Sequence, residues 1–95
     1  MSREITTVGV VGLGTMGAGI VEVLARNGVD VVAVEVDEDR AAAGRERIQR
    51  STDRAVARGK LSAESQTELL GRVKVTSSLA ELAGCHLVIE AVPER

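Results

Sequence analysis

The feature that most constrains this chain is a glycine turn at the end of a short apolar strand. Residues Thr7–Val11 are β-branched and almost entirely apolar, as expected for a strand of a parallel sheet that is buried on both faces. This run leads into the pattern Gly12-x-Gly14-x-x-Gly17, and a helix is expected to begin near Thr15. A strand, a Gly-x-Gly-x-x-Gly turn and a helix together form the arrangement with which a parallel α/β sheet holds the pyrophosphate of a dinucleotide.

Each glycine of the turn has a separate physical role. Gly12 allows a tight turn in which a Cβ atom would clash, Gly14 lets the backbone approach the phosphates, and Gly17 lets the helix pack close to the strand. The free N–H groups and the positive dipole end of the helix then face the anion. The predicted cofactor-binding residues on this turn are Gly12, Leu13, Gly14, Thr15, Met16 and Gly17.

An acidic residue follows at the position where a ribose is expected. The helix after the turn has apolar residues at helical spacing and is expected to end at Asn27–Gly28. Those apolar residues are Met16, Ile20, Val23 and Leu24. The next apolar run, Val29–Val36, is interrupted by Asp30 and Glu35, and Glu35 lies 18 residues after Gly17. A carboxylate at this strand end accepts hydrogen bonds from the adenosine ribose, so we predict that Glu35 binds the cofactor.

The rest of the chain predicts alternating helices and strands. We expect a long helix from Glu38 to about Arg58 and a short helix capped by Ser62 that runs to Leu70. We then expect a strand at 73–76, a brief helix that begins at Ser77 or Ser78 and runs through Leu82, and a strand at 87–89. The thin apolar stripe of the long helix consists of Ala41, Ile48, Ala55 and Val56. Right-handed crossovers give the strand order 3-2-1-4, the first part of a Rossmann-type doubly wound parallel sheet. Residues 1–95 therefore form one domain, which we expect to be incomplete because such sheets normally continue past the fourth strand.

Composition excludes several other classes of function. The net charge of −2 argues against general nucleic-acid binding, and no apolar run approaches the roughly 18 residues of a membrane span. Met1–Glu4 leads directly into the first strand, so no signal peptide is expected. A single cysteine, Cys85, permits no intrachain disulfide and fits a cytoplasmic location. With one histidine, His86, and one cysteine, the chain lacks the ligands for a typical metal site, and we expect both residues to be structural.

Several stretches together resemble the N-terminal part of the 3-hydroxyacyl-CoA dehydrogenases. The resemblance covers nearly the whole chain and includes the segment 10–20, the run 31–35 that ends in Glu35, the polar helix that leads into 58–61, and the closing segment 87–94. It implies an NAD-dependent oxidation of a 3-hydroxyacyl-CoA to the 3-oxoacyl-CoA in fatty acid metabolism. It also implies that Ala91, Val92 and Glu94 lie near the nicotinamide. Independently of the resemblance, we expect Glu90 to pack or hydrogen-bond locally.

The chain departs from this family in two respects. Family members have Asp where this chain has Glu35, whose carboxylate reaches one methylene further. The family's catalytic His–Glu pair and the helical domain that completes the substrate site also lie beyond the matched region. We therefore assign no catalytic residue within these 95 residues and expect the chain alone to be inactive.

The long helix carries a concentration of basic residues that has two interpretations. Seven of the twelve basic residues fall between Arg40 and Lys60, where they form either a solvated helix face or a docking site for coenzyme A phosphates. In the family, the positions of Ser51 and Arg58 contact coenzyme A, and a separation of seven residues places both on one helix face. We therefore expect an acyl-CoA as the small-molecule partner and a homo-oligomer as the assembly. Two alternatives stay open, namely the cofactor domain of a β-hydroxyacid dehydrogenase and a non-catalytic dinucleotide-binding module.

Overall fold

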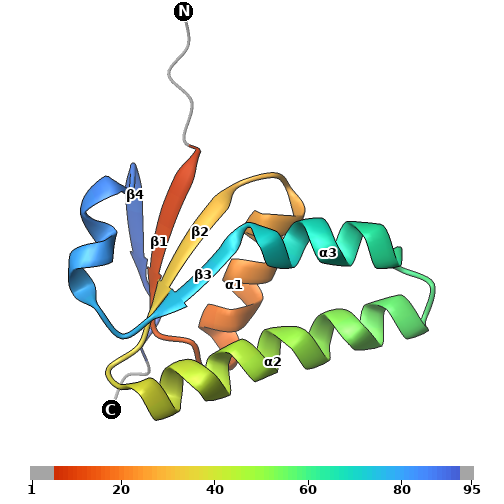
Figure 1. The fold of residues 1–95 in the computed structure, drawn as a ribbon, viewed down its shortest axis with the longest axis horizontal. Coiled ribbons are helices and arrows are strands. Elements are labelled where there is room, and N and C mark those ends of the chain that lie inside the picture. The colour runs from red at the N-terminus through yellow and green to blue at the C-terminus, as the bar shows by residue number, and fades with distance from the viewer. Residues whose placement is uncertain (1–5, 93–95) are drawn as a thin grey trace, which may run out of the picture.

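The computed structural model describes residues 6–92 and contains a four-stranded parallel sheet (Figure 1). Its elements are β1 (Thr7–Val11), α1 (Thr15–Arg26), β2 (Asp30–Val34), α2 (Glu38–Ala57), α3 (Ala63–Gly71), β3 (Val73–Thr76), the 3₁₀ helix η1 (Leu79–Gly84) and β4 (Leu87–Glu90). The strand order is β3-β2-β1-β4, and each neighbouring pair is parallel. The predicted order and fold class are therefore confirmed.

The connections cover the two faces of the sheet unequally. Helices α1, α2 and α3 lie together on one side of the sheet, whereas η1 lies on the other side next to β4 (Figure 1). This follows from right-handed crossovers, because the chain moves outward from β1 to β3 and then returns past β1 to β4. The central strands β1 and β2 are buried, and Val8, Val10, Val31 and Ala33 are at most 2% exposed.

The buried face of α1 consists mainly of small residues and not of its largest apolar side chains. Met16 and Val23 are 62% and 61% exposed, and Ile20 and Leu24 are only half-buried. The residues that α1 buries are Gly17, Ala18, Val21 and Ala25. Small residues occupy this face because the helix packs closely on the strands: a Cβ atom added at Gly17 would overlap the carbonyl oxygen of Gly12. Ile20 and Leu24 also pack against the core, so two of the four apolar residues found at helical spacing contribute to it.

Helix α2 begins and ends as predicted, and the predicted stripe is confirmed at Ala41 and Ile48. The Asp37 carboxylate caps it by accepting a hydrogen bond of 2.8 Å from the Arg40 N–H. Its buried residues are Ala41, Gly44, Ile48 and Thr52, whereas the predicted stripe residues Ala55 and Val56 are half-buried. Thr52 is a fully buried polar residue, and its hydroxyl donates to the carbonyl of Ile48 at 2.9 Å and accepts from Gln66 of α3 at 3.0 Å.

The remaining predicted elements are also present. Helix α3 has Ser62 as its cap, with the hydroxyl accepting from the Ser65 N–H at 3.0 Å. The brief helix after β3 is the 3₁₀ helix η1, which starts after Ser78 without a side-chain cap hydrogen bond. Strand β4 is at the sheet edge, and its Leu87 and Val88 are 47% and 46% exposed. None of the helices in the described part of the chain is both long and apolar enough to cross a membrane.

Candidate dinucleotide-binding site

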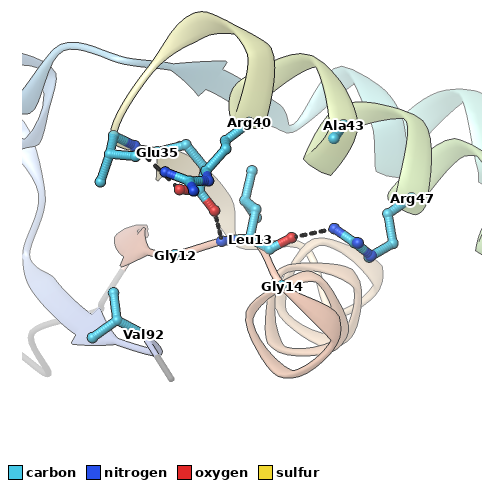
Figure 2. A pocket seen from close by; sticks show the side chains of 9 residues that line it. Gly12, Leu13, Gly14, Glu35, Arg40, Ala43, Arg47 and Val92 are labelled. Carbon is cyan, nitrogen blue, oxygen red and sulfur yellow. Dashed lines mark hydrogen bonds between the residues drawn. The ribbon is translucent and has the colours of Figure 1, made fainter. Parts of the chain in front are cut away.

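A pocket of about 410 Å³ lies at the carboxyl ends of β1 and β2 (Figure 2). It is lined by the turn residues 12–14, by Glu35 and Val36 after β2, by Arg40, Ala43 and Arg47 of α2, and by Val92 after β4. In open parallel sheets, ligands bind outside the carboxyl ends of the strands, where the strand order reverses. Here the order reverses beside β1, between β2 and β4, so the pocket lies at the expected location.

The glycine turn has the geometry that a close approach of ligand requires. Gly12 has a φ of +101°, a left-handed conformation that L side chains rarely adopt, and a Cβ atom there would lie 3.0 Å from the carbonyl oxygen of Ala91. Gly14 differs because, apart from its own atoms and its two chain neighbours, no heavy atom of the described chain lies within 4 Å of the position of its missing Cβ. Packing within the described fold therefore does not require glycine at position 14, and the missing side chain leaves open space at the pocket wall.

The Glu35 carboxylate lines the pocket and also bonds the glycine turn. Its Oε2 accepts a hydrogen bond of 2.6 Å from the Leu13 N–H, and its Oε1 accepts one of 3.1 Å from the Val36 N–H (Figure 2). A carboxylate offers about four acceptor positions, so these two bonds leave room for ribose hydroxyls. The carboxylate predicted for ribose binding therefore also orients the turn on which the phosphates would rest.

Helix α2 contacts Leu13, the same turn residue, through its carbonyl oxygen and its side chain. The Arg47 guanidinium donates from Nη1 to the carbonyl oxygen of Leu13 at 2.8 Å, and Figure 2 shows it reaching from α2 toward the turn. The Leu13 side chain is 1% exposed and packs against α2 at Gly44, where a Cβ atom would lie 2.6 Å from two of its carbons. Leu13 is thus fixed by Glu35 at its N–H, by Arg47 at its carbonyl and by α2 at its side chain.

The other predicted cofactor residues are placed around the pocket or outside the described residues. Thr15 and Met16 are exposed at the start of α1 and do not line the pocket. Gly17 is buried against Gly12, and Ala91 is buried at 5% exposure beneath the turn. Val92 lines the pocket, whereas Glu94 lies outside the residues that the structure describes.

The two residues predicted for coenzyme A lie away from this pocket. Ser51 is half-buried, and its hydroxyl donates to Oε2 of Glu22 on α1 at 2.7 Å. Arg58 is exposed at the C-cap of α2, whereas the pocket is lined by the first half of that helix. The first half of α2 therefore lines the dinucleotide pocket, and the two predicted coenzyme A residues follow later in the helix and at its C-cap.

His86 and Cys85 have contacts consistent with the structural roles expected of them. The Nδ1 atom of His86 accepts hydrogen bonds of 3.3 Å from the N–H groups of Thr6 and Thr7, where the chain enters β1. Cys85 is half-buried, and its sulfur would lie 3.2 Å from a Cβ atom at Gly9. Glu90 is exposed at the end of β4 and pairs in register with Val11.

Sequence reasoning missed the contribution of α2 to the pocket. Arg40, Ala43 and Arg47 line it, but they match no motif, and the two arginines belong to a basic run interpreted either as a solvated helix face or as a coenzyme A docking site. One signal was available in Gly44, because a glycine inside a long helix is unfavourable unless another part of the chain approaches closely.

Comparison with known proteins decides the family. Residues 7–95 match the sequence model of the 3-hydroxyacyl-CoA dehydrogenase NAD-binding domain. The chain belongs to this family. Its dinucleotide is therefore NAD, which agrees with the cofactor predicted from the glycine turn and Glu35.

The relatives are considerably longer than this chain. A 3-hydroxybutyryl-CoA dehydrogenase of Mycobacterium tuberculosis is 48% identical over 99% of the chain and 33% of its own length. The crystal structure of M. tuberculosis FadB2 superposes with a TM-score of 0.95 at 46% identity, over 98% of this chain and 33% of that one. The (S)-3-hydroxybutyryl-CoA dehydrogenase PaaH1 of Ralstonia eutropha gives a TM-score of 0.92 at 36% identity, over 97% of this chain and 32% of that one. The chain thus spans about a third of the length of these relatives.

Proposed function

We propose that this chain is the cofactor-binding part of an enzyme that oxidises a 3-hydroxyacyl-CoA to the 3-oxoacyl-CoA with NAD. The observation that carries the proposal is the pocket, in which a glycine with open space on its Cβ side adjoins a carboxylate at the end of β2. Membership of the family supports the reaction type, and the names of the relatives support a short-chain acyl-CoA substrate in fatty acid metabolism. Membership of this family also favours the oxidation of a 3-hydroxyacyl-CoA over the reaction of a β-hydroxyacid dehydrogenase.

The residues present fit NAD. Backbone N–H groups of the turn and of the start of α1 would hold the pyrophosphate, and Glu35 would accept hydrogen bonds from the adenosine ribose. Ala91, Val92 and Glu94 would lie toward the nicotinamide, as the family resemblance implies. When bound, NAD supplies the acceptor of the hydride that leaves the hydroxyl-bearing carbon. In this proposal, the catalytic His–Glu pair and the helical domain lie outside the 95 residues, so the chain alone gives no turnover.

The substrate and assembly parts of the proposal concern other surfaces. Ser51 and Arg58 would contact coenzyme A, for which Arg58 is exposed and Ser51 would have to share its hydroxyl with Glu22. In the isolated 95-residue chain, copies would associate through the exposed apolar edge strand β4. A cytoplasmic location, which the single cysteine favours, completes the proposal.

Cofactor choice provides the test. Calorimetric titration should show that the chain binds NAD more tightly than NADP, because the Glu35 carboxylate accepts from a 2′-hydroxyl and repels a 2′-phosphate. Calorimetry is suitable because the chain has no tryptophan to report binding by fluorescence. Glu35→Ser should narrow the preference by removing the charge. Equal affinity of the parent chain for the two cofactors would contradict the role of Glu35.

A further inference from the structure

We propose that Arg47 is a phosphate-binding residue of the dinucleotide site, an inference that rests on the proposed function. Arg47 lines the pocket from α2, and its guanidinium reaches the glycine turn (Figure 2). The sequence placed it in a basic run whose expected partners were water or coenzyme A. The structure instead directs it toward the residues on which the pyrophosphate would rest.

The tertiary packing of α2 fixes the position of this guanidinium. Gly44 allows α2 to approach the buried side chain of Leu13, and Arg47 follows about one helical turn later. From there its Nη1 donates to the Leu13 carbonyl oxygen at 2.8 Å. This bond holds the long side chain against the turn, so less conformational entropy remains to be lost when a ligand binds.

The guanidinium keeps most of its hydrogen-bonding capacity for a ligand. Arginine has five N–H donors in a planar fork that matches phosphate oxygens, and Leu13 accepts from one of them. Within residues 6–92, the ion pairs of α2 join Arg40 to Asp37 and Arg50 to Glu46, and none involves Arg47. Because Arg47 is exposed, its remaining donors are accessible from solvent.

The full positive charge of Arg47 would add to the partial charges with which the glycine turn attracts an anion. Backbone N–H groups and a helix N-terminus supply only partial charges, whereas the pyrophosphate of a dinucleotide carries two negative charges. Glu35 adds a negative charge to the same pocket, which makes a nearby cation more useful to an anionic ligand. The adenosine part of the ligand carries no charge, so the contribution of Arg47 should depend on the phosphates.

The test compares ligands with and without phosphates. We would titrate the chain and its Arg47→Met variant with NAD, ADP and adenosine, following amide shifts of ¹⁵N-labelled protein. Loss of one charged hydrogen-bonding group predicts that NAD and ADP bind about 10- to 100-fold more weakly to the variant. Adenosine affinity should change less than about twofold, and added salt should reduce the loss for ADP.

Arg50→Met is the matched control, because Arg50 lies on the same helix, is exposed and does not line the pocket. It should bind all three ligands like the parent chain, and circular dichroism should show that both variants remain folded. If Arg47→Met weakened the binding of ADP and of adenosine equally, Arg47 would only position the turn. If the ADP affinity did not change, Arg47 would have no role in ligand binding, and either result overturns the proposal. Failure of the parent chain itself to bind NAD would instead refute the proposed function and, with it, this inference.

Discussion

Gly44 offers a sharp test of how α2 is held against the glycine turn. A Cβ atom at this position would lie 2.6 Å from both Cβ and Cδ1 of Leu13, whereas ordinary van der Waals contact begins at 3.4 Å. Leu13 is 1% exposed, so its side chain cannot move aside into solvent without leaving a cavity. Gly44→Ala should therefore push α2 away from the turn by a large fraction of an ångström.

The expected magnitude combines two opposing effects. Overpacking of this kind costs about 1–3 kcal/mol of folding free energy, and replacing glycine by alanine inside a helix gains about 1 kcal/mol. Gly44→Ala should therefore be roughly neutral to 2 kcal/mol destabilising. Gly19→Ala is the matched control, because Gly19 lies inside α1 and, apart from its chain neighbours and the nearby backbone of its own helix, no heavy atom of the described chain lies within 4 Å of its missing Cβ. The control should gain about 1 kcal/mol.

The difference between these two variants isolates the packing effect. It should amount to about 1–3 kcal/mol, which for a domain of this size separates the two midpoints by at least about 4 °C. Thermal unfolding followed by far-UV circular dichroism measures it. NAD affinity should also fall in Gly44→Ala, because a displaced α2 moves the guanidinium of Arg47 away from the turn. A Gly44→Ala chain that is stabilised as much as Gly19→Ala would refute the reasoning.

Four further predictions follow from individual contacts. Gly14→Val should abolish NAD binding in calorimetry with the helical circular dichroism spectrum intact, because its side chain would fill open space and not a packed interior; retained affinity would mean that the turn is only structural. Arg58→Ala should weaken coenzyme A binding by about 1–3 kcal/mol. Lys74→Ala should leave coenzyme A binding unchanged, because Lys74 pairs with Glu81 of η1 on the other side of the sheet. Equal coenzyme A affinity of the two variants would mean that the basic run of α2 is only a solvated helix face. A hydrogen bond from Gln66, and to a smaller extent one from Gln49, lowers the pKa of Asp53, so the ionised carboxylate stabilises the fold fully above its ordinary pKa of 3.8 and this stabilisation is lost as pH falls through the lowered pKa. Asp53→Asn should therefore remove this part of the pH dependence of urea unfolding, and a pH profile identical to that of the parent chain would contradict the prediction. Sedimentation should show concentration-dependent self-association that Leu87→Lys suppresses, and a monomeric parent chain at high concentration would count against pairing through β4.

Local patterns were sufficient to predict the order and type of the elements. The strand, glycine turn and helix at 7–26, the acidic residue after β2 and the caps at Asp37 and Ser62 depend on residues close in sequence. The strand order followed from the handedness of the connections, which is nearly invariant in parallel sheets. Apolar spacing predicted the helix α1 but not its buried face, because it does not reveal that a closely packed helix buries small residues and leaves Met16 exposed.

The sequence by itself determined the architecture and placed Gly12 and Glu35 at the pocket, since a backbone conformation at Gly12 and a carboxylate at the end of β2 are local requirements. Only the tertiary structure decided which face of α2 meets the glycine turn. The contact between Arg47 and Leu13 joins residues 34 positions apart, and the contact between Ser51 and Glu22 joins residues 29 apart. Both depend on how closely α2 approaches the rest of the fold, a distance set by side-chain volumes at Gly44 and Leu13 that no spacing within one helix encodes.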